Sequence, residues 1–123
     1  MKKILSLMFS LSTLFGCKSQ AKTIIQKLDV ITFKEVIKKG NVQLIDVRTP
    51  YEYQQGHIKN AKPIDFFAND FKEKTQQLDK ERPVYLYCRS GNRSGKASKI
   101  LNELGFKEIY DLKGGFIAWS RQN

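Results

Sequence analysis

Apolar residues occur along the chain in short runs that predict strands, and segments with helical periodicity lie between these runs. Five runs have the length and the apolar or β-branched content of strands, at 24–28, 42–47, 62–66, 84–87 and 108–112. Residues with helical spacing or helix-start signals predict helices at 32–38, 50–55, 69–78, 94–104 and 115–119. Strands that alternate with helices in this way are typical of a parallel sheet.

Capping signals mark the starts of two of these helices. Thr32 and Glu35 have the spacing of a capping box, which predicts Thr32 as the cap of the first helix. Pro50 follows Thr49 and suits the first turn of the second helix. A chain of 123 residues is long enough for one core. We therefore expect a single α/β domain over residues 24–121, with a central parallel sheet of about five strands flanked by helices on both faces.

A cysteine stands directly after the run 84–87, and this position is the most informative one in the chain. Six small or cationic residues follow it: Arg89, Ser90, Gly91, Asn92, Arg93 and Ser94. In a parallel sheet this order places Cys88 at the carboxyl edge, beside a loop and the positive end of a helix. Inward N–H groups and the helix dipole favour a thiolate there. Cys88 is thus the predicted catalytic residue, and the six loop residues are the predicted substrate-binding residues.

The first sixteen residues have the features of an export signal. Lys2 and Lys3 precede an apolar run over 4–15, which is too short for a permanent membrane span. The run ends in the residues LFGC (14–17), which resemble the lipobox of bacterial lipoproteins. By that resemblance residues 1–16 are removed, Cys17 is lipidated, and residues 17–23 form a tether. We expect an exported lipoprotein of the cell envelope that faces the periplasm, on the inner or the outer membrane; the alternative is an ordinary signal peptide with Cys17 left free or lost.

Lipidation of Cys17 changes what the second cysteine means. The chain has two cysteines, so Cys88 would then be the only thiol and no internal disulfide could form. A free cysteine in an oxidising compartment is a liability unless it has a chemical role. The predicted export signal therefore favours a reactive Cys88.

The charge of the chain is strongly basic but spread out. The formal net charge is +10 at pH 7, and loss of residues 1–16 removes two lysines and no acid, which leaves +8. Lysines are interleaved with acidic residues and form no arginine-rich stripe, so we expect no nucleic-acid partner. Attraction to anionic lipid or to small anions fits this surface better. Nothing in the sequence requires an oligomer, and we expect a monomer.

Three separated segments resemble the signatures of single-domain rhodaneses. The first is DVRTPYEY (46–53) with GHIKNA (56–61), the second is CRSGNRS (88–94), and the third is LKGGFIAW (112–119). They occur in the order of the family and together span nearly all of residues 24–120. The resemblance implies a rhodanese-like fold.

The resemblance also implies sulfur transfer without a cofactor. Cys88 would attack the outer sulfur of a small anionic donor such as thiosulfate, release sulfite and hold a persulfide. Cyanide or a thiol would then accept the sulfur. Loop N–H groups would stabilise the anionic persulfide, and Arg89 and Arg93 would attract the donor. No general base is needed if Cys88 is already a thiolate.

Three other functions remain open at this point. Phosphatases and arsenate reductases with a related loop need an arginine separated from the cysteine by five residues. Ser94 occupies the position where that arginine would stand, and Arg93 lies one residue early. A non-catalytic binding module is a second possibility, against which the presence of Cys88 argues. An exported persulfide carrier for a partner is the third, and the sequence does not separate it from a free-standing enzyme.

The other polar motif residues are predicted to have structural roles. Asp46, Arg48 and Glu52 predict an ion-pair and hydrogen-bond group that holds the loop after the second strand. His57 is the only histidine and is predicted to bond to backbone in a turn; without a ligand cluster we expect no metal site. We expect the side chain of Arg89 to point to solvent, and Arg93 to contact either the donor or a carboxylate of the fold.

Overall fold

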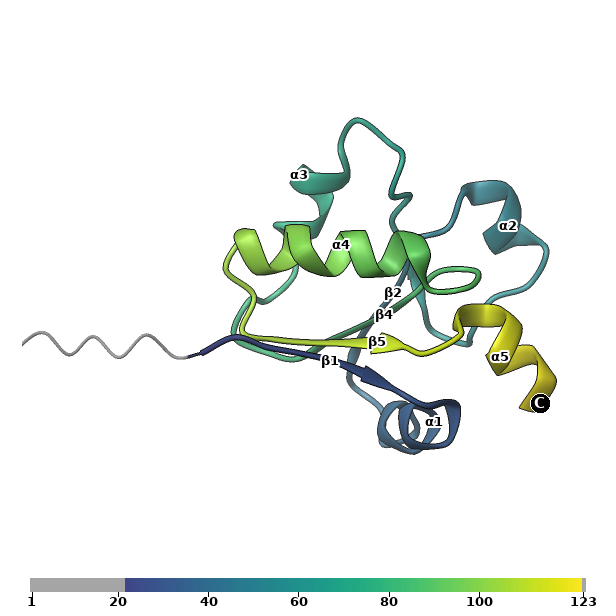
Figure 1. Ribbon diagram of the computed structural model, residues 1–123. Helices are drawn as coiled ribbons and strands as arrows, with labels where there is room; N and C mark the ends of the chain where they lie inside the picture. The colour runs from purple at the N-terminus through teal and green to yellow at the C-terminus, as the bar shows by residue number, and fades with distance from the viewer. Residues whose placement is uncertain (1–21, 123) are drawn as a thin grey trace, which may run out of the picture.

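The computed structural model describes residues 22–122, which form one five-stranded sheet with helices packed on it (Figure 1). The strands are β1 (Ile24–Leu28), β2 (Gln43–Asp46), β3 (Lys62–Pro63), β4 (Val84–Tyr87) and β5 (Glu108–Leu112). They lie in the order β1-β5-β4-β2-β3, and every neighbouring pair is parallel. The predicted α/β fold is confirmed. The predicted leader and Cys17 lie outside the described residues.

Five helices connect and cover the strands. They are α1 (Val30–Lys38), α2 (Pro50–Gln54), α3 (Phe71–Thr75), α4 (Asn92–Glu103) and α5 (Gly115–Gln122). In Figure 1, α3 and α4 lie on one side of the sheet and α1 on the other, while α2 and α5 lie toward the edge to which the strand arrows point. Within residues 22–122 no helix is both long enough and apolar enough to cross a bilayer.

The core has two halves, one on each face of the sheet. Ile45, Leu86 and Ile109 pack with residues of α3 and α4, whereas Phe33 and Tyr87 belong to the cluster beneath α1 and α5. Successive strand residues point to opposite faces of the sheet, and each face carries one half of the core. The central strand β4 is therefore buried along its whole length. This explains why its sequence is an uninterrupted run of large apolar and aromatic residues.

The prediction for the start of the first helix is wrong. α1 begins at Val30, and Asp29 is its N-cap, with Oδ1 accepting a hydrogen bond from the Thr32 N–H at 2.8 Å. The earlier start lets Val30 and Phe33, three residues apart, both face the sheet and become buried. The predicted capping box is therefore not formed at this helix.

Other boundaries differ from the prediction by a few residues. The second helix does begin at Pro50, with Thr49 as its N-cap. β2, β3 and α3 are shorter than predicted, and α4 begins two residues earlier, at Asn92. The earlier start of α4 matters most, because it brings the first turn of the helix directly against the residues that follow Cys88.

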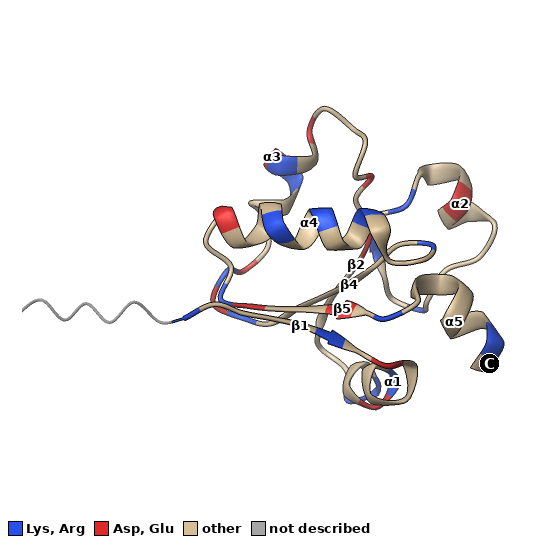
Figure 2. Ribbon diagram, viewed as in Figure 1, with Lys and Arg blue, Asp and Glu red and all other residues tan. Residues whose placement is uncertain are grey.

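Lys and Arg residues are spread over the helices and loops, with acidic residues among them (Figure 2).

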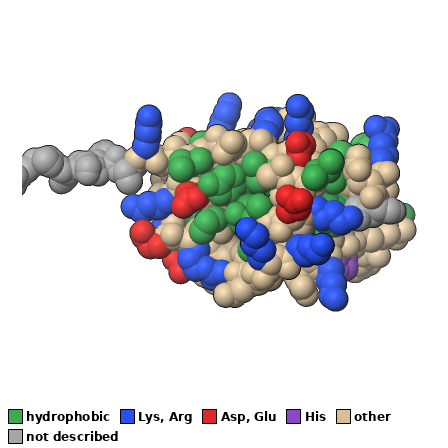
Figure 3. Space-filling model, turned by 90° about the horizontal axis from the view of Figure 1, so that it is seen from below, with side chains coloured by type: hydrophobic (Ala, Val, Ile, Leu, Met, Phe, Trp, Pro, Cys, Tyr) green, Lys and Arg blue, Asp and Glu red, His purple; other side chains and the backbone are tan. Residues whose placement is uncertain are grey.

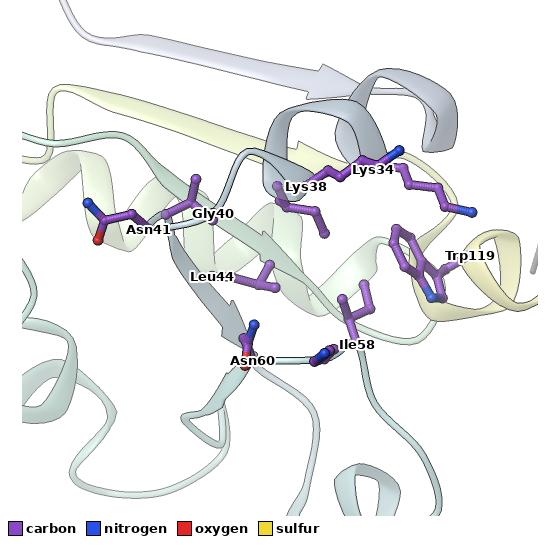
Figure 4. A pocket seen from close by; sticks show the side chains of 11 residues that line it. Lys34, Lys38, Gly40, Asn41, Leu44, Ile58, Asn60 and Trp119 are labelled. Atoms are coloured by element: carbon purple, nitrogen blue, oxygen red, sulfur yellow. The ribbon is translucent and has the colours of Figure 1, made fainter.

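The face that carries α1 has a groove of about 410 Å³. On this face hydrophobic side chains gather among basic ones (Figure 3). Leu44, Ile58 and Trp119 contribute apolar surface to the groove, and Lys34 and Lys38 of α1 line it on one side (Figure 4). Cys88 belongs to the core half on the opposite face of the sheet. This groove is therefore separate from the loop that follows Cys88.

Candidate active site

Cys88 directly follows β4, and its side chain is 1% exposed. The Gly91 N–H donates a hydrogen bond to Sγ at 3.0 Å, and Ser94 Oγ lies 3.4 Å from Sγ. As a thiol, Cys88 donates to Ser94 Oγ, which in turn donates to the Gly91 carbonyl oxygen at 3.3 Å. As a thiolate, the sulfur can only accept, and rotation of the Ser94 hydroxyl supplies it with a second donor. The pocket thus holds both forms of the sulfur.

The loop conformation aims the Gly91 N–H at the sulfur. Gly91 has φ +115° and is the N-cap of α4, a conformation that L side chains rarely adopt. Asn92 and Arg93 are the first residues of α4, and within residues 22–122 their N–H groups donate to no protein group. These N–H groups and the dipole of the helix favour negative charge at the N-terminus of α4, where the Gly91 N–H contacts Sγ.

The first turn of α5 supports the backbone of the loop that follows Cys88. The Phe116 N–H donates to the Cys88 carbonyl oxygen at 2.8 Å, and the Ile117 N–H donates to the Arg89 carbonyl oxygen at 3.1 Å. Gly115 has φ +59°, and a Cβ on it would lie 2.5 Å from the Arg89 oxygen. Only glycine allows this close approach, so the first turn of α5 fixes the backbone on which the thiol stands.

Arg93 pairs with a carboxylate of the fold. Its two terminal nitrogens donate to the two carboxylate oxygens of Glu52 at 2.7 and 2.9 Å. Glu52 also accepts from the Thr49 N–H at 3.0 Å, which closes the capping box of α2. The hydrogen bonds from Arg93, with smaller help from Thr49, lower the pKa of Glu52 from 4.5 to about 2. This pair ties α2 to the loop after Cys88.

The predicted group of Asp46, Arg48 and Glu52 is only partly present. Arg48 donates to both carboxylate oxygens of Asp46, at 2.7 to 3.2 Å, and both side chains are buried. Arg48 also donates to the Gly56 carbonyl oxygen at 2.7 Å and lies 4.3 Å from the centre of the Phe116 ring. Glu52 belongs instead to the pair with Arg93. Sequence spacing suggested one group, and the fold makes two.

The remaining loop residues lie at the surface. Arg89, Ser90 and Asn92 are exposed. Arg89 lines a groove of about 430 Å³ together with Tyr51 and Arg121. Within residues 22–122 neither Arg89 nor Arg121 makes an ion pair. The loop therefore presents backbone donors and Ser94 near the sulfur, and an unpaired guanidinium outside.

His57 has a structural environment. Its Nδ1 lies 3.0 Å from the Tyr53 carbonyl oxygen, and its ring stacks on the Tyr53 ring with centroids 3.7 Å apart. Within residues 22–122 no group of three or more His, Cys, Asp or Glu side chains could hold a metal ion. His57 is thus held by the backbone and the ring of Tyr53.

Two residues near the loop were missed by the sequence analysis. Gly115 was placed only at the start of the last predicted helix, because its close approach to the loop depends on the folded structure. Asp111 in β5 is 2% exposed; its Oδ2 is 3.1 Å from Lys27 Nζ, and its Oδ1 has no hydrogen-bond partner in the described residues. Burial raises the pKa of Asp111, opposed by the Ser94 hydroxyl and by Lys27. An acidic residue beside Leu112 in an otherwise strand-like run was the available signal.

The comparison with protein families agrees with this geometry. The Rhodanese-like domain family matches residues 29–122. The chain belongs to this family. Among solved structures, the rhodanese-related protein of Thermoplasma volcanium superposes with a TM-score of 0.70 at 30% identity, over 80% of this chain and 93% of that one.

Curated rhodanese-like relatives differ in what they do. The uncharacterized protein YqhL of Bacillus subtilis is 46% identical over 63% of this chain and 60% of its own length. The thiosulfate sulfurtransferase GlpE of Coxiella burnetii is 39% identical over 69% of this chain and 78% of its own length. The tRNA uridine(34) hydroxylase of Cytophaga hutchinsonii is 41% identical over 75% of this chain but only 30% of its own length. The chain thus spans most of the length of some relatives and a minor part of others.

Proposed function

We propose that this protein is a sulfurtransferase in which Cys88 carries the transferred sulfur as a persulfide. The observation that supports this most directly is the position of Sγ, which accepts a hydrogen bond from the Gly91 N–H at 3.0 Å at the N-terminus of α4. A persulfide is an anion near neutral pH, and such a site stabilises anions. The thiosulfate sulfurtransferase GlpE of Coxiella burnetii, a relative that this chain covers over most of its length, supports the same chemistry.

The proposed reaction has two displacements. The Cys88 thiolate attacks the outer sulfur of thiosulfate or a similar donor, the S–S bond of the donor breaks, and sulfite leaves with the electron pair. The terminal sulfur of the new persulfide then accepts attack by cyanide or by a thiolate, and the Cys88 thiolate leaves. Loop N–H groups and the Ser94 hydroxyl stabilise the negative charge in each state. No general base and no cofactor are required.

The pairing of Arg93 argues against phosphatase or arsenate reductase chemistry. Those reactions need a guanidinium that closes over a tetrahedral anion held above the cysteine. Both terminal nitrogens of Arg93 are engaged by Glu52, 2.7 and 2.9 Å away. Breaking this pair would leave a half-buried carboxylate without its partner. Sulfur transfer, which relies on backbone donors, needs no such rearrangement.

The deciding experiment is a mass measurement of the persulfide cycle. Purified protein is treated with thiosulfate and then with cyanide, and its intact mass is recorded after each step. We expect a gain of one sulfur, about 32 Da, that cyanide removes. Cys88→Ser should fold normally and show no gain. A reduced, folded protein that gains no sulfur from thiosulfate or from small persulfide donors would indicate a binding module instead.

We also propose that the protein is an exported, monomeric lipoprotein of the cell envelope, anchored through Cys17. The supports are the short apolar run and the lipobox-like residues 14–17. Incorporation of labelled palmitate into the protein, and its loss in Cys17→Ala, would test the anchor. Secretion of an unlabelled, cleaved protein would favour the ordinary signal peptide.

A further inference from the structure

Two large aromatic side chains are exposed next to the loop that follows Cys88. Tyr51 is 71% exposed and lines the same groove as Arg89. Phe67 is 65% exposed, and the guanidinium of Arg93 lies 5.7 Å from the centre of its ring. Each aromatic therefore stands beside an arginine of the loop. Exposed aromatic and arginine side chains are the residues most enriched in protein–protein interfaces.

The groove beside the loop carries positive charge that the fold does not neutralise. Two of its charged lining residues are paired, Arg48 with Asp46 and Glu52 with Arg93. The other two, Arg89 and Arg121, make no ion pair within residues 22–122. Basic residues are visible on the loop between β4 and α4 and near the end of α5 (Figure 2). The partner that complements this groove carries carboxylates.

We propose that Tyr51, Phe67, Arg89 and Arg121 form an acceptor-docking surface, which receives a protein whose thiol is flanked by acidic residues. The inference rests on the proposed function and names the class of its physiological acceptor. A small anion such as thiosulfate needs the loop donors and has no use for aromatic surface outside them. A protein segment uses both, since the aromatics supply apolar contact and the arginines select its charge.

The transfer on this surface is balanced without an added reagent. The acceptor thiolate attacks the terminal sulfur of the Cys88 persulfide, and a new S–S bond forms on the acceptor. The bond between Cys88 Sγ and that sulfur breaks, and Sγ leaves as a thiolate. The acceptor departs as a persulfide, and Cys88 is ready for another donor molecule.

The test compares thiol probes of opposite charge on persulfide-loaded protein. The probes are a short peptide with acidic residues on both sides of one cysteine, the same peptide with lysines in their place, and the small thiols thioglycolate and cysteamine. Each rate of sulfur removal is divided by the rate at which the same thiol reduces an aromatic disulfide in free solution. We expect the acidic peptide to be about tenfold faster than the basic one at low salt, with the ratio falling as salt is added.

Variants then locate the effect. Arg121→Ser should lower the ratio of the acidic-peptide rate to the basic-peptide rate by about threefold or more. Tyr51→Ala should lower the ratio of the acidic-peptide rate to the small-thiol rates by about threefold or more, because Tyr51 supplies apolar contact that small thiols do not use. Lys38→Ser is the matched control, because it removes one positive charge from the groove on the α1 face, and it should keep the ratio. Both Tyr51 and Arg121 are exposed, so neither substitution should prevent folding.

Three results would overturn the inference. Equal normalised rates for the two peptides would mean that the surface does not select an acidic acceptor. A ratio for thioglycolate over cysteamine as large as that for the peptides would mean that it recognises free anions. An effect of Lys38→Ser as large as that of Arg121→Ser would assign the preference to overall charge. If cyanide removes no sulfur from thiosulfate-treated protein without substitutions, the proposed function itself fails. This outcome is distinguishable from the other three.

Discussion

The pair between Glu52 and Arg93 predicts a pH-dependent loss of stability on substitution of Glu52. Glu52→Gln keeps an amide oxygen that can accept from the Thr49 N–H, so the capping box of α2 can persist. It removes the negative charge that faces both terminal nitrogens of Arg93. The variant therefore isolates the ionic part of the contact between α2 and the loop after Cys88.

The size of the effect follows from the pKa of Glu52 and from its exposure. A pKa of about 2 in place of 4.5 corresponds to roughly 3 kcal/mol in favour of the charged form in the folded state. The side chains of Arg93 and Glu52 are 19% and 23% exposed, so solvent screens part of this interaction. We expect Glu52→Gln to lower the free energy of unfolding by about 1–2 kcal/mol at pH 7.

Urea unfolding of both proteins across pH provides the assay. The carboxylate has a lowered pKa in the folded state, so its contribution is fully present above the ordinary value of 4.5. The difference between the two proteins should shrink as pH falls from 4.5 toward 2. Glu73→Gln on the exposed surface of α3 is the control and should change stability by less than about 0.5 kcal/mol. A Glu52→Gln effect no larger than this, or one that is constant with pH, would refute the reasoning.

Three further substitutions test other contacts. Gly115→Ala should lower the free energy of unfolding by about 2–4 kcal/mol in thermal unfolding, because the added Cβ meets the backbone of the loop. Gly95→Ala is the control and should be neutral or slightly stabilising, because the space around position 95 in the interior of α4 is open. Similar effects at the two sites would contradict this reasoning. Tyr87→Phe removes the acceptor of the buried Ile58 N–H, 3.0 Å away, and should cost about 1–3 kcal/mol in urea unfolding, with no loss meaning that the N–H finds another partner. Burial raises the pKa of Asp111, so ionisation of its carboxyl group opposes folding. Asp111→Asn should therefore be more stable than the protein without the substitution at pH 7, and the gain should vanish as pH falls toward 3.8. A lower stability of the variant at pH 7 would show that the carboxylate is needed.

Local patterns predicted most of the fold because its strands and helices are locally encoded. All five strands were located, and β4 was placed to the residue, since a short continuous apolar run that ends at a small-residue loop is typical of a buried parallel strand. The start of α1 was misplaced because both Asp29 and Thr32 are good caps. The choice between them depends on which turn brings Val30 and Phe33 onto the sheet, and that is tertiary information.

The candidate site was less predictable than the fold because its contacts join distant residues. Glu52 and Arg93 are 41 positions apart, and neither carries a local sign of the other. Asp46 and Arg48 are two positions apart, and their pair was expected. The backbone approach of Gly115 to the loop likewise requires the sheet to be assembled. Residue types near Cys88 could be inferred from sequence, but their pairing could not.

The strand order has a consequence for when the site comes into being during synthesis. β1 pairs only with β5, from Ile24 opposite Glu108 to Leu28 opposite Leu112, so the first strand has no partner until the last one has been made. The bonds from Phe116 and Ile117 to the loop form later still. A nascent chain that has passed Cys88 but not residue 117 therefore lacks both the sheet edge and the support of the loop. The thiol acquires its anion-stabilising surroundings only in the finished domain, which limits its chemistry during translation.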